Sequence, residues 1–528
     1  MPMSLAPPRR CISLVCSSLL LVVASLATPV AVTAQPSPAL SHDDIHWLQR
    51  ASFGLDSATL ESYRQLGRQG WLEQQLGDRN DTLPPAIGAL IDSYPALNTP
   101  PAELLAEEAD ARRQLKAMPD GDAKVAARKQ LQKHARELAR QAQQAELLHA
   151  IYGSNPLKEQ MVWFWLNHFS VYAAKGRVRL LAAHYEEDVI RPHALGKFRD
   201  LVMATLKSPA MLEFLDNAKN VKGKTNENYA RELMELHTLG VGSGYTQQDV
   251  QQLALILTGA TIAPMAPRRA GRRGNRFGRN HPGVVRDGLF VFNPARHDFG
   301  NKLFLGHAIR GSGYDEIEQA VTLITRQPAC ASFISRQLAE YFAADQPPPA
   351  LVDAMAATFR RTDGDIAAVL RTMFDSPALL AANAKKFKDP TQFLVSAMKL
   401  SHDGQPIRNA RPLLNWLNRM GEPVFGRITP DGWPLDAASW SGSGQMAARF
   451  EVARAIGSGR NMLFVTDTGD RQSAAPAMRP TVPTLDSPLY RATMEPYLSD
   501  AARAALHKAH SAEEWNTYLL SSPDFNYR

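Results

Sequence analysis

Cysteine is scarce in this chain of 528 residues, which contains only three. Cys11 and Cys16 both lie in the apolar N-terminal segment, so removal of that segment leaves Cys330 alone. A single cysteine excludes an intramolecular disulfide, and the core must hold the fold without one. Cys330 lies in an apolar stretch and is predicted to be inert packing.

Long apolar runs are also missing beyond the N-terminus. The best later stretch, Leu253 to Ala263, is shorter than the roughly 20 residues that cross a bilayer. We therefore predict no transmembrane segment in the mature chain and interpret this stretch as a buried helix.

A broadly basic surface is absent although the net charge is +7. The charge falls to +5 without Arg9 and Arg10, and to −1 when the six arginines of Arg268 to Arg279 are also left out. These six lie in an irregular Arg/Gly-rich segment, residues 264–293, predicted to be an exposed loop. The loop is either a solvated insertion or a site that attracts an anionic polymer. Nucleic-acid binding is disfavoured, because it requires a basic face on a recognisable module.

Familiar catalytic signatures are missing as well. The chain has no Gly-x-Ser-x-Gly elbow and no His-Glu-x-x-His zinc motif. Gly223-Lys224-Thr225 imitates the end of a phosphate-binding loop, but Ala218 stands where that loop needs a glycine. Asp363-Gly364-Asp365 is more typical of a turn and helix N-cap than of a metal pair.

The N-terminus is built like a secretory signal. Arg9 and Arg10 precede an apolar run from Cys11 to Ala27, and small residues follow up to Ala34. We expect cleavage near Ala34, which places the mature protein in the periplasm or outside the cell. A retained membrane anchor is the alternative.

Helical patterns fill the rest of the chain. Apolar residues recur at three and four spacing, and proline often follows a capping residue, where its missing donor costs nothing. The starts expected from this pattern are Asn155-Pro156, Ser208-Pro209, Ser376-Pro377 and Ser522-Pro523, and Thr246 with Asp249 forms a capping box.

The expected fold is therefore mainly α. We predict one large multi-helix domain over residues 35–528, with a subdivision near 310–350 left open and at most a minor β-hairpin around residues 289–292. Ala102 to Met118 and Ala123 to Tyr152 are predicted to form a charged helical hairpin, broken at Pro119-Asp120-Gly121. The hairpin is either a plain structural arm or an arm that binds a partner.

Several motifs together resemble a known family. They are Phe164-Trp165-Leu166-Asn167-His168-Phe169, the run Asn226 to Gly240, His297-Asp298-Phe299-Gly300, Ile190-Arg191-Pro192-His193, Lys386-Phe387-Lys388-Asp389-Pro390 and Pro430-Asp431-Gly432-Trp433-Pro434. From about His42 to the end, the chain resembles the bacterial exported family catalogued as domain of unknown function 1800. The resemblance implies an exported helical protein, and it implies a partner, because genes of that family often stand beside one for a secreted sulfatase-like protein. It carries over no catalytic residue.

The residues of Asn226 to Leu239 form two faces when placed on a helix at about 100° per residue. Glu227, Arg231 and Glu235 share one face with Asn228, and Glu232 lies at its edge. This face is either a solvated charge ladder or a polar face turned inward, where carboxylates act as acid and base or bind a cation.

Three further positions combine polar groups with apolar surroundings. Asn167 and His168 lie in an aromatic helix, and His297 with Asp298 lies in an irregular segment, where functional residues concentrate. Glu146 and His149 have the i, i+3 spacing of helical metal ligands, but no second pair accompanies them. We hypothesise that Asn167-His168, the polar helix face and His297-Asp298 converge, with Arg191 and Arg231 balancing the carboxylates.

Two classes of function follow. The first is an extracytoplasmic enzyme, hydrolase-like or metal-assisted, that acts on an envelope or extracellular polymer. The second is a non-catalytic scaffold or partner of another exported protein. For the enzyme, the predicted catalytic residues are His168, Glu232, Glu235, His297 and Asp298, and the predicted substrate-binding residues are Asn167, Arg191, Asn228 and Arg231. Metal and cofactor remain open.

Overall fold

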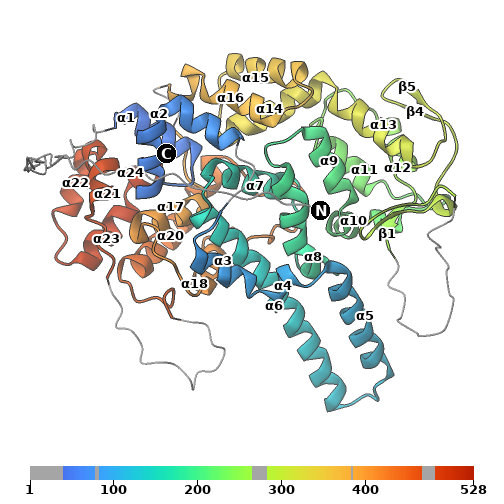
Figure 1. Ribbon diagram of the computed structural model, residues 1–528, viewed down its shortest axis with the longest axis horizontal. Helices are drawn as coiled ribbons and strands as arrows, with labels where there is room; N and C mark the ends of the chain where they lie inside the picture. The colour runs from blue at the N-terminus through green and yellow to red at the C-terminus, as the bar shows by residue number, and fades with distance from the viewer. Residues whose placement is uncertain (1–39, 78–81, 264–281, 382–384, 466–481) are drawn as a thin grey trace, which may run out of the picture. The chain divides into compact units, whose positions relative to one another are not determined.

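The computed structural model describes residues 40–77, 82–263, 282–381, 385–465 and 482–528. The predicted signal, residues 1–34, and the arginines of Arg268 to Arg279 lie outside these ranges. Within them the chain is mainly α-helical, as predicted, with two small antiparallel sheets (Figure 1).

The first six helices build one flank and an arm. They are α1 (His42–Ala51), α2 (Ser57–Gly77), α3 (Pro85–Asp92), α4 (Pro95–Asn98), α5 (Pro101–Ala117) and α6 (Asp122–Tyr152). The predicted charged hairpin is confirmed as α5 and α6, whose far ends project from the body (Figure 1). The second half of α6 carries buried side chains, including Leu147 and Leu148, so the arm is rooted in the core.

Helix α7 (Pro156–His168) is the centre of the molecule. Every side chain from Pro156 to Leu166 is buried, which explains why the helix is rich in aromatic residues and lacks a polar face. Around and after it lie α8 (Val178–His184), a π-helix (Tyr185–Ile190), 3-10 turns (Arg191–His193 and Asn217–Lys219), α9 (Phe198–Lys207), α10 (Pro209–Phe214), α11 (Asn228–Glu235) and α12 (Gln247–Ile256).

The strands exceed what was predicted. The expected hairpin is present as β2 (Val285–Asp287) and β3 (Phe290–Phe292), but β1 (Ala260–Ile262) pairs with β3 as a third strand. Leu253 to Ala263 was therefore wrong as one helix, because Gly259 (φ +85°) turns the chain into β1. A second hairpin, β4 (Lys302–Phe304) with β5 (His307–Ile309), was not predicted.

The remaining helices complete the body. They are α13 (Tyr314–Thr325), α14 (Pro328–Phe342), α15 (Pro349–Arg361), α16 (Ile366–Phe374), α17 (Pro390–His402), α18 (Arg411–Arg419), α19 (Ala437–Trp440), α20 (Ser443–Gly457), α21 (Pro488–Thr493), α22 (Asp500–Leu506), α23 (Ala512–Ser521) and α24 (Pro523–Asn526), with 3-10 turns at Pro294–Arg296, Pro377–Leu380 and Glu495–Tyr497. The end of the chain returns to the start, since Tyr497 Oη donates to the carbonyl of Leu40.

Local capping chemistry was predicted correctly. Asn155, Ser208, Ser376 and Ser522 each accept a backbone hydrogen bond at the start of the helix or turn that follows. The Thr246–Asp249 capping box is present, and Asp365 caps α16. Cys330 is fully buried in α14, and burial raises the pKa of its thiol.

Candidate functional site

Asn167, the penultimate residue of α7, anchors the loop Pro430–Pro434. Its Nδ2 donates to the carbonyl of Trp433 (3.0 Å), and its Oδ1 accepts from the Trp433 amide (2.6 Å). Gly432 is required between them, because its φ is +73° and an added Cβ would lie 2.3 Å from the carbonyl oxygen of Asn167. The loop is therefore fixed against the end of the central helix.

This loop presents a carboxylate, Asp431, that is held in its ionised form. Arg427 donates to both carboxylate oxygens (3.0 and 2.7 Å), and Thr429 Oγ1 donates to Oδ1 (2.5 Å). Partial burial raises the pKa of Asp431, but these hydrogen bonds outweigh it and hold the pKa below its usual range. The Arg427 guanidinium also lies over the Trp433 ring at 5.4 Å.

Glu232 on α11 lies near Asp431 and has the opposite shift. Burial raises the pKa of this half-buried carboxyl, the charge of Glu235 raises it further, Arg231 lowers it, and Asp431 raises it. In the part of the chain that the structure describes, no hydrogen bond or ion pair engages the Glu232 side chain. Two carboxyls from distant segments thus have pKa values shifted in opposite directions, and the charge of one acts on the other, as in an acid and base pair.

The rest of the α11 face forms the predicted charge ladder. Arg231 contacts Glu227 and Glu235 at 3.2 Å each and donates to Gln247 at 2.8 Å. The Arg231 side chain is 37% exposed, so the ladder itself is a solvated surface feature. Asn228, at the start of the helix, ties α11 to α10 by donating to the carbonyl of Leu215 (3.2 Å).

His168 joins α7 to the turn that follows α11. Its Nε2 lies 3.0 Å from the carbonyl of His237, so Nε2 carries a proton, and its ring stacks on Phe164. Burial lowers the pKa of His168 to about 4, which makes the ring neutral at pH 7. Helix α11 ends at Glu235, earlier than the predicted Leu239, and His237 is fully buried with no hydrogen-bond partner for either ring nitrogen among the described residues.

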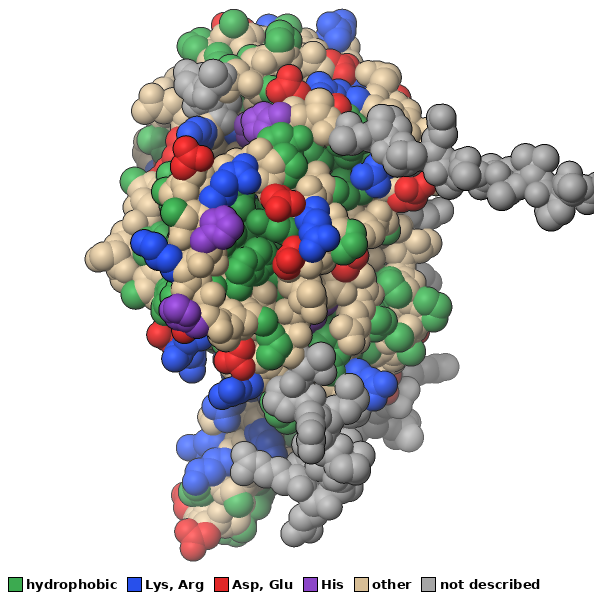
Figure 2. Space-filling view, turned by 90° about the vertical axis from the view of Figure 1, so that its left-hand side faces the viewer, with side chains coloured by type: hydrophobic (Ala, Val, Ile, Leu, Met, Phe, Trp, Pro, Cys, Tyr) green, Lys and Arg blue, Asp and Glu red, His purple; other side chains and the backbone are tan. Residues whose placement is uncertain are grey.

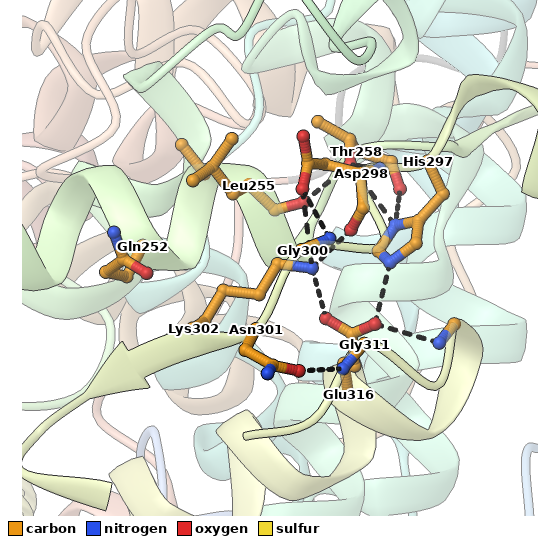
Figure 3. A network of polar contacts seen from close by, with 12 residues as sticks. Gln252, Leu255, Thr258, His297, Asp298, Gly300, Asn301, Lys302, Gly311 and Glu316 are labelled. Carbon is orange, nitrogen blue, oxygen red and sulfur yellow. Dashed lines mark hydrogen bonds and ion pairs between the residues drawn. The ribbon is translucent and has the colours of Figure 1, made fainter. Parts of the chain in front are cut away.

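His297 belongs to a separate, fully buried ion network (Figure 3). Its Nδ1 lies 2.7 Å from the carbonyl of Thr258, and its Nε2 lies 2.9 Å from Glu316 Oε1. Lys302 Nζ contacts the other oxygen, Glu316 Oε2, at 2.6 Å. Burial raises the pKa of Glu316, but its hydrogen bonds with His297, Lys302 and the Gly313 amide outweigh this and lower the pKa below its usual range.

Asp298 completes this network as a turn residue. Its backbone amide donates to Thr258 Oγ1 (2.9 Å), its Oδ1 accepts from the Gly300 amide (2.8 Å), and its carbonyl accepts from Lys302 Nζ. Among the described residues, no hydrogen bond or ion pair links His297 or Asp298 to His168 or to α11. The irregular segment was expected, but His297 is enclosed and satisfied.

Arg191 lies in a third network rather than beside the α11 carboxylates. It contacts Glu159 at a short distance, Glu186 at 3.0 Å, Glu187 at 3.4 Å and Glu146 at 3.8 Å. Sequence reasoning named Glu146 but missed the other three. The acidic run Glu186-Glu187-Asp188 was the only local signal, and the π-helix that contains it brings both glutamates to Arg191.

The structure therefore brings together Asn167, His168 and the α11 face, and adds Asp431. It holds Arg191 in one buried network and His297 with Asp298 in another. The catalytic and substrate-binding roles predicted for these residues remain predictions. Among the described residues, no group of three His, Cys, Asp or Glu side chains is placed to hold a metal ion.

The comparison with family profiles decides the family. A profile described as "Protein of unknown function (DUF1800)" matches residues 46–527. The chain belongs to this family. No curated protein and no solved structure matches it. Across the described ranges, no helix is both long and apolar enough to span a membrane.

Proposed function

We propose that this DUF1800 protein is an exported hydrolase that cleaves a polymer of the cell envelope, with Glu232 as general acid and Asp431 as the ionised partner. The proposal is supported by the opposite directions in which the pKa values of Glu232 and Asp431 are shifted, and by the effect of the Asp431 charge on Glu232. Export rests on the signal-like segment from Arg9 to Ala34.

The chemistry assigns each group one task. Glu232, with its raised pKa, keeps a proton to give to the leaving-group oxygen, while Asp431 activates water or stabilises positive charge. Trp433 beside them supplies an aromatic surface of the kind that packs against sugar rings. A polysaccharide is therefore the substrate class that fits best, because most enzymes that hydrolyse glycosidic bonds use two carboxyls with separated pKa values.

The test uses the mature protein and isolated envelope glycans, with released reducing ends as the readout. Glu232→Gln and Asp431→Asn should each lower the rate by at least about 100-fold, the usual contribution of a positioned acid or base. Their melting temperatures should stay close to that of the parent, because Glu232 is half-buried and unpaired and Asp431 is exposed. Glu227→Gln, on the same helix, is the matched control and should retain activity. Full activity in Glu232→Gln would contradict the proposal.

A second candidate function, attachment to an anionic partner, is favoured by the arm. A cavity of about 620 Å³ between α5 and α6 is lined by one carboxylate, Glu108, and by the cations Arg112, Lys116, Lys124, Arg128 and Arg179. Lys and Arg side chains gather where the arm leaves the body (Figure 2). Such a groove attracts a polyanion, in a way that salt weakens.

Charge reversal tests this candidate. The double variant Lys116→Glu with Arg128→Glu should lose binding to a soluble polyanion such as heparin at low salt. The control, Lys129→Glu with Lys133→Glu, changes the same net charge on exposed positions that do not line the groove. Equal losses of binding in both double variants would show that net charge alone causes the effect, and would contradict a binding site in this groove.

A further inference from the structure

Three buried lysines between residues 386 and 399 differ in the groups that balance their charge. Lys386 Nζ lies 2.6 Å from Asp345, and Lys399 Nζ lies 2.6 Å from Asp56. Lys388 is 6% exposed and has no carboxylate within ion-pair distance among the described residues. Its side chain makes one hydrogen bond, to Ser396 Oγ at 3.1 Å. A buried ammonium without a counter-ion is costly, so this site favours the neutral amine.

The surroundings of Lys388 act on its charge in opposite directions. The Nζ atom lies 4.0 Å from the centre of the Phe525 ring, a contact that favours the ammonium, whereas two buried guanidinium groups nearby, Arg449 and Arg528, disfavour it. Burial, with the charges of Arg528 and Arg449, lowers the pKa of Lys388 to about 7. About half of the molecules therefore carry a free amine at neutral pH, and a neutral amine is a nucleophile.

The amine also borders an internal space with a route to the surface. A cavity of about 30 Å³ is lined by Lys388, Ser396 and Phe525. Gln49, Thr493, Met494 and Asp524 line both this cavity and a surface groove of about 550 Å³, so the two spaces adjoin at these four residues. Because one water needs roughly 10–15 Å³ of such space, only a small reactive group fits beside the amine.

We propose that Lys388 is a nucleophilic lysine that forms an imine with a small aldehyde entering through this groove. The Nζ lone pair bonds to the carbonyl carbon, and the carbonyl oxygen takes up a proton to give a carbinolamine. Loss of water, with the second amine hydrogen, then leaves the carbon–nitrogen double bond. Ser396 Oγ is placed to pass the proton. An aldehyde fits better than a ketone, because its second substituent is only hydrogen.

The test treats the mature protein with propanal and sodium cyanoborohydride at pH 7, followed by peptide mass mapping. Lys388 should be alkylated at least about tenfold faster than exposed lysines, whose pKa near 10.4 leaves little free amine. Lys386 and Lys399 are matched controls, since each is buried but paired. Trimethylacetaldehyde, which is branched, should label Lys388 much more slowly than propanal.

Two variants keep the outcome decisive. Lys388→Met should abolish the fast phase without lowering the melting temperature, because it replaces an unpaired buried amine with an apolar chain of similar length. Lys399→Met should leave the fast phase in place in whatever fraction stays folded. Labelling confined to exposed lysines, with Lys388 unmodified in the folded parent, would overturn the proposal. This result is independent of Glu232 and Asp431.

Discussion

The buried ion networks around Glu316 and around Arg191 combine cations and carboxylates in different proportions. Around Glu316, Lys302 Nζ contacts one carboxylate oxygen and His297 Nε2 contacts the other, so one carboxylate meets one ammonium. Around Arg191, a single guanidinium meets four glutamates. The first network is close to balance without further protons. The Arg191 network has more carboxylates than cations, so its excess negative charge must be neutralised by protonation.

Protons supply the missing balance in the Arg191 network. Burial raises the pKa of Glu146 to about 7, and burial with the charge of Glu146 raises that of Glu186 well above its ordinary value. The charge of Glu146 raises the pKa of Glu186, so a proton on either carboxyl relieves the repulsion between them. The contrast shows that the proportion of cations to carboxylates decides whether a buried network depends on pH.

Arg191→Met should have the largest effect. It removes the guanidinium that contacts three buried carboxyls, Glu146, Glu159 and Glu186, and the half-buried Glu187. The free energy of unfolding should fall by about 5 kcal/mol at pH 8, the upper range for a broken buried pair. The loss should be smaller at pH 5, where the carboxyls take up protons. Urea unfolding at the two pH values measures this. An equal loss at both would show that charge excess is not the cause.

Glu316→Gln should cost about 3 kcal/mol, because it leaves Lys302 and His297 buried without their carboxylate. Asp315→Asn, one residue earlier and exposed, is the control. Thermal unfolding of both variants provides the measurement, and similar values for the two would mean that the network contributes nothing.

Glu146→Gln should remove part of the pH dependence of the free energy of unfolding. With a pKa of about 7 in the folded protein and an ordinary value of 4.5, Glu146 holds a proton between these values only when folded. Its contribution to stability is therefore full below about pH 4.5 and is lost as pH rises to about 7, by roughly 2–3 kcal/mol.

Histidines with lowered pKa values also contribute to the pH dependence of the free energy of unfolding, with the opposite sign to Glu146. His46, His168 and His402 have pKa values lowered to about 4, mainly by burial, so their contributions are lost as pH falls and oppose that of Glu146. The useful quantity is the difference between parent and Glu146→Gln across pH 4.5 to 8. A difference that does not change over this range would contradict the assignment.

Arg231→Ala should have the smallest effect, about 0.5–1 kcal/mol, because its pairs with Glu227 and Glu235 are half-exposed and screened by solvent. High salt should remove most of this difference in chemical denaturation. A loss of several kcal/mol would show that the α11 ladder contributes as much as the buried networks, which would contradict the expected difference between exposed and buried ion pairs.

Local patterns in the sequence predicted features whose partners lie within a few residues. Ser208 and Thr246 cap their helices, and Glu227, Arg231 and Glu235 form a ladder, because helix geometry places residues three and four apart side by side. The prediction failed at Gly259. The apolar pattern continues through this residue, but its positive φ stops the helix, and a strand begins at the next residue.

By itself, the sequence determined the helical class, the charged arm and the helix caps, because these depend on periodicity and on hydrogen bonds between near neighbours. Only the tertiary structure decided which charges meet. Arg191 lies among Glu146, Glu159, Glu186 and Glu187. The charge of Asp431 acts on Glu232, and Lys388 is buried without a carboxylate at ion-pair distance among the described residues. Desolvation and charge act through space, and packing sets which distant segments share that space.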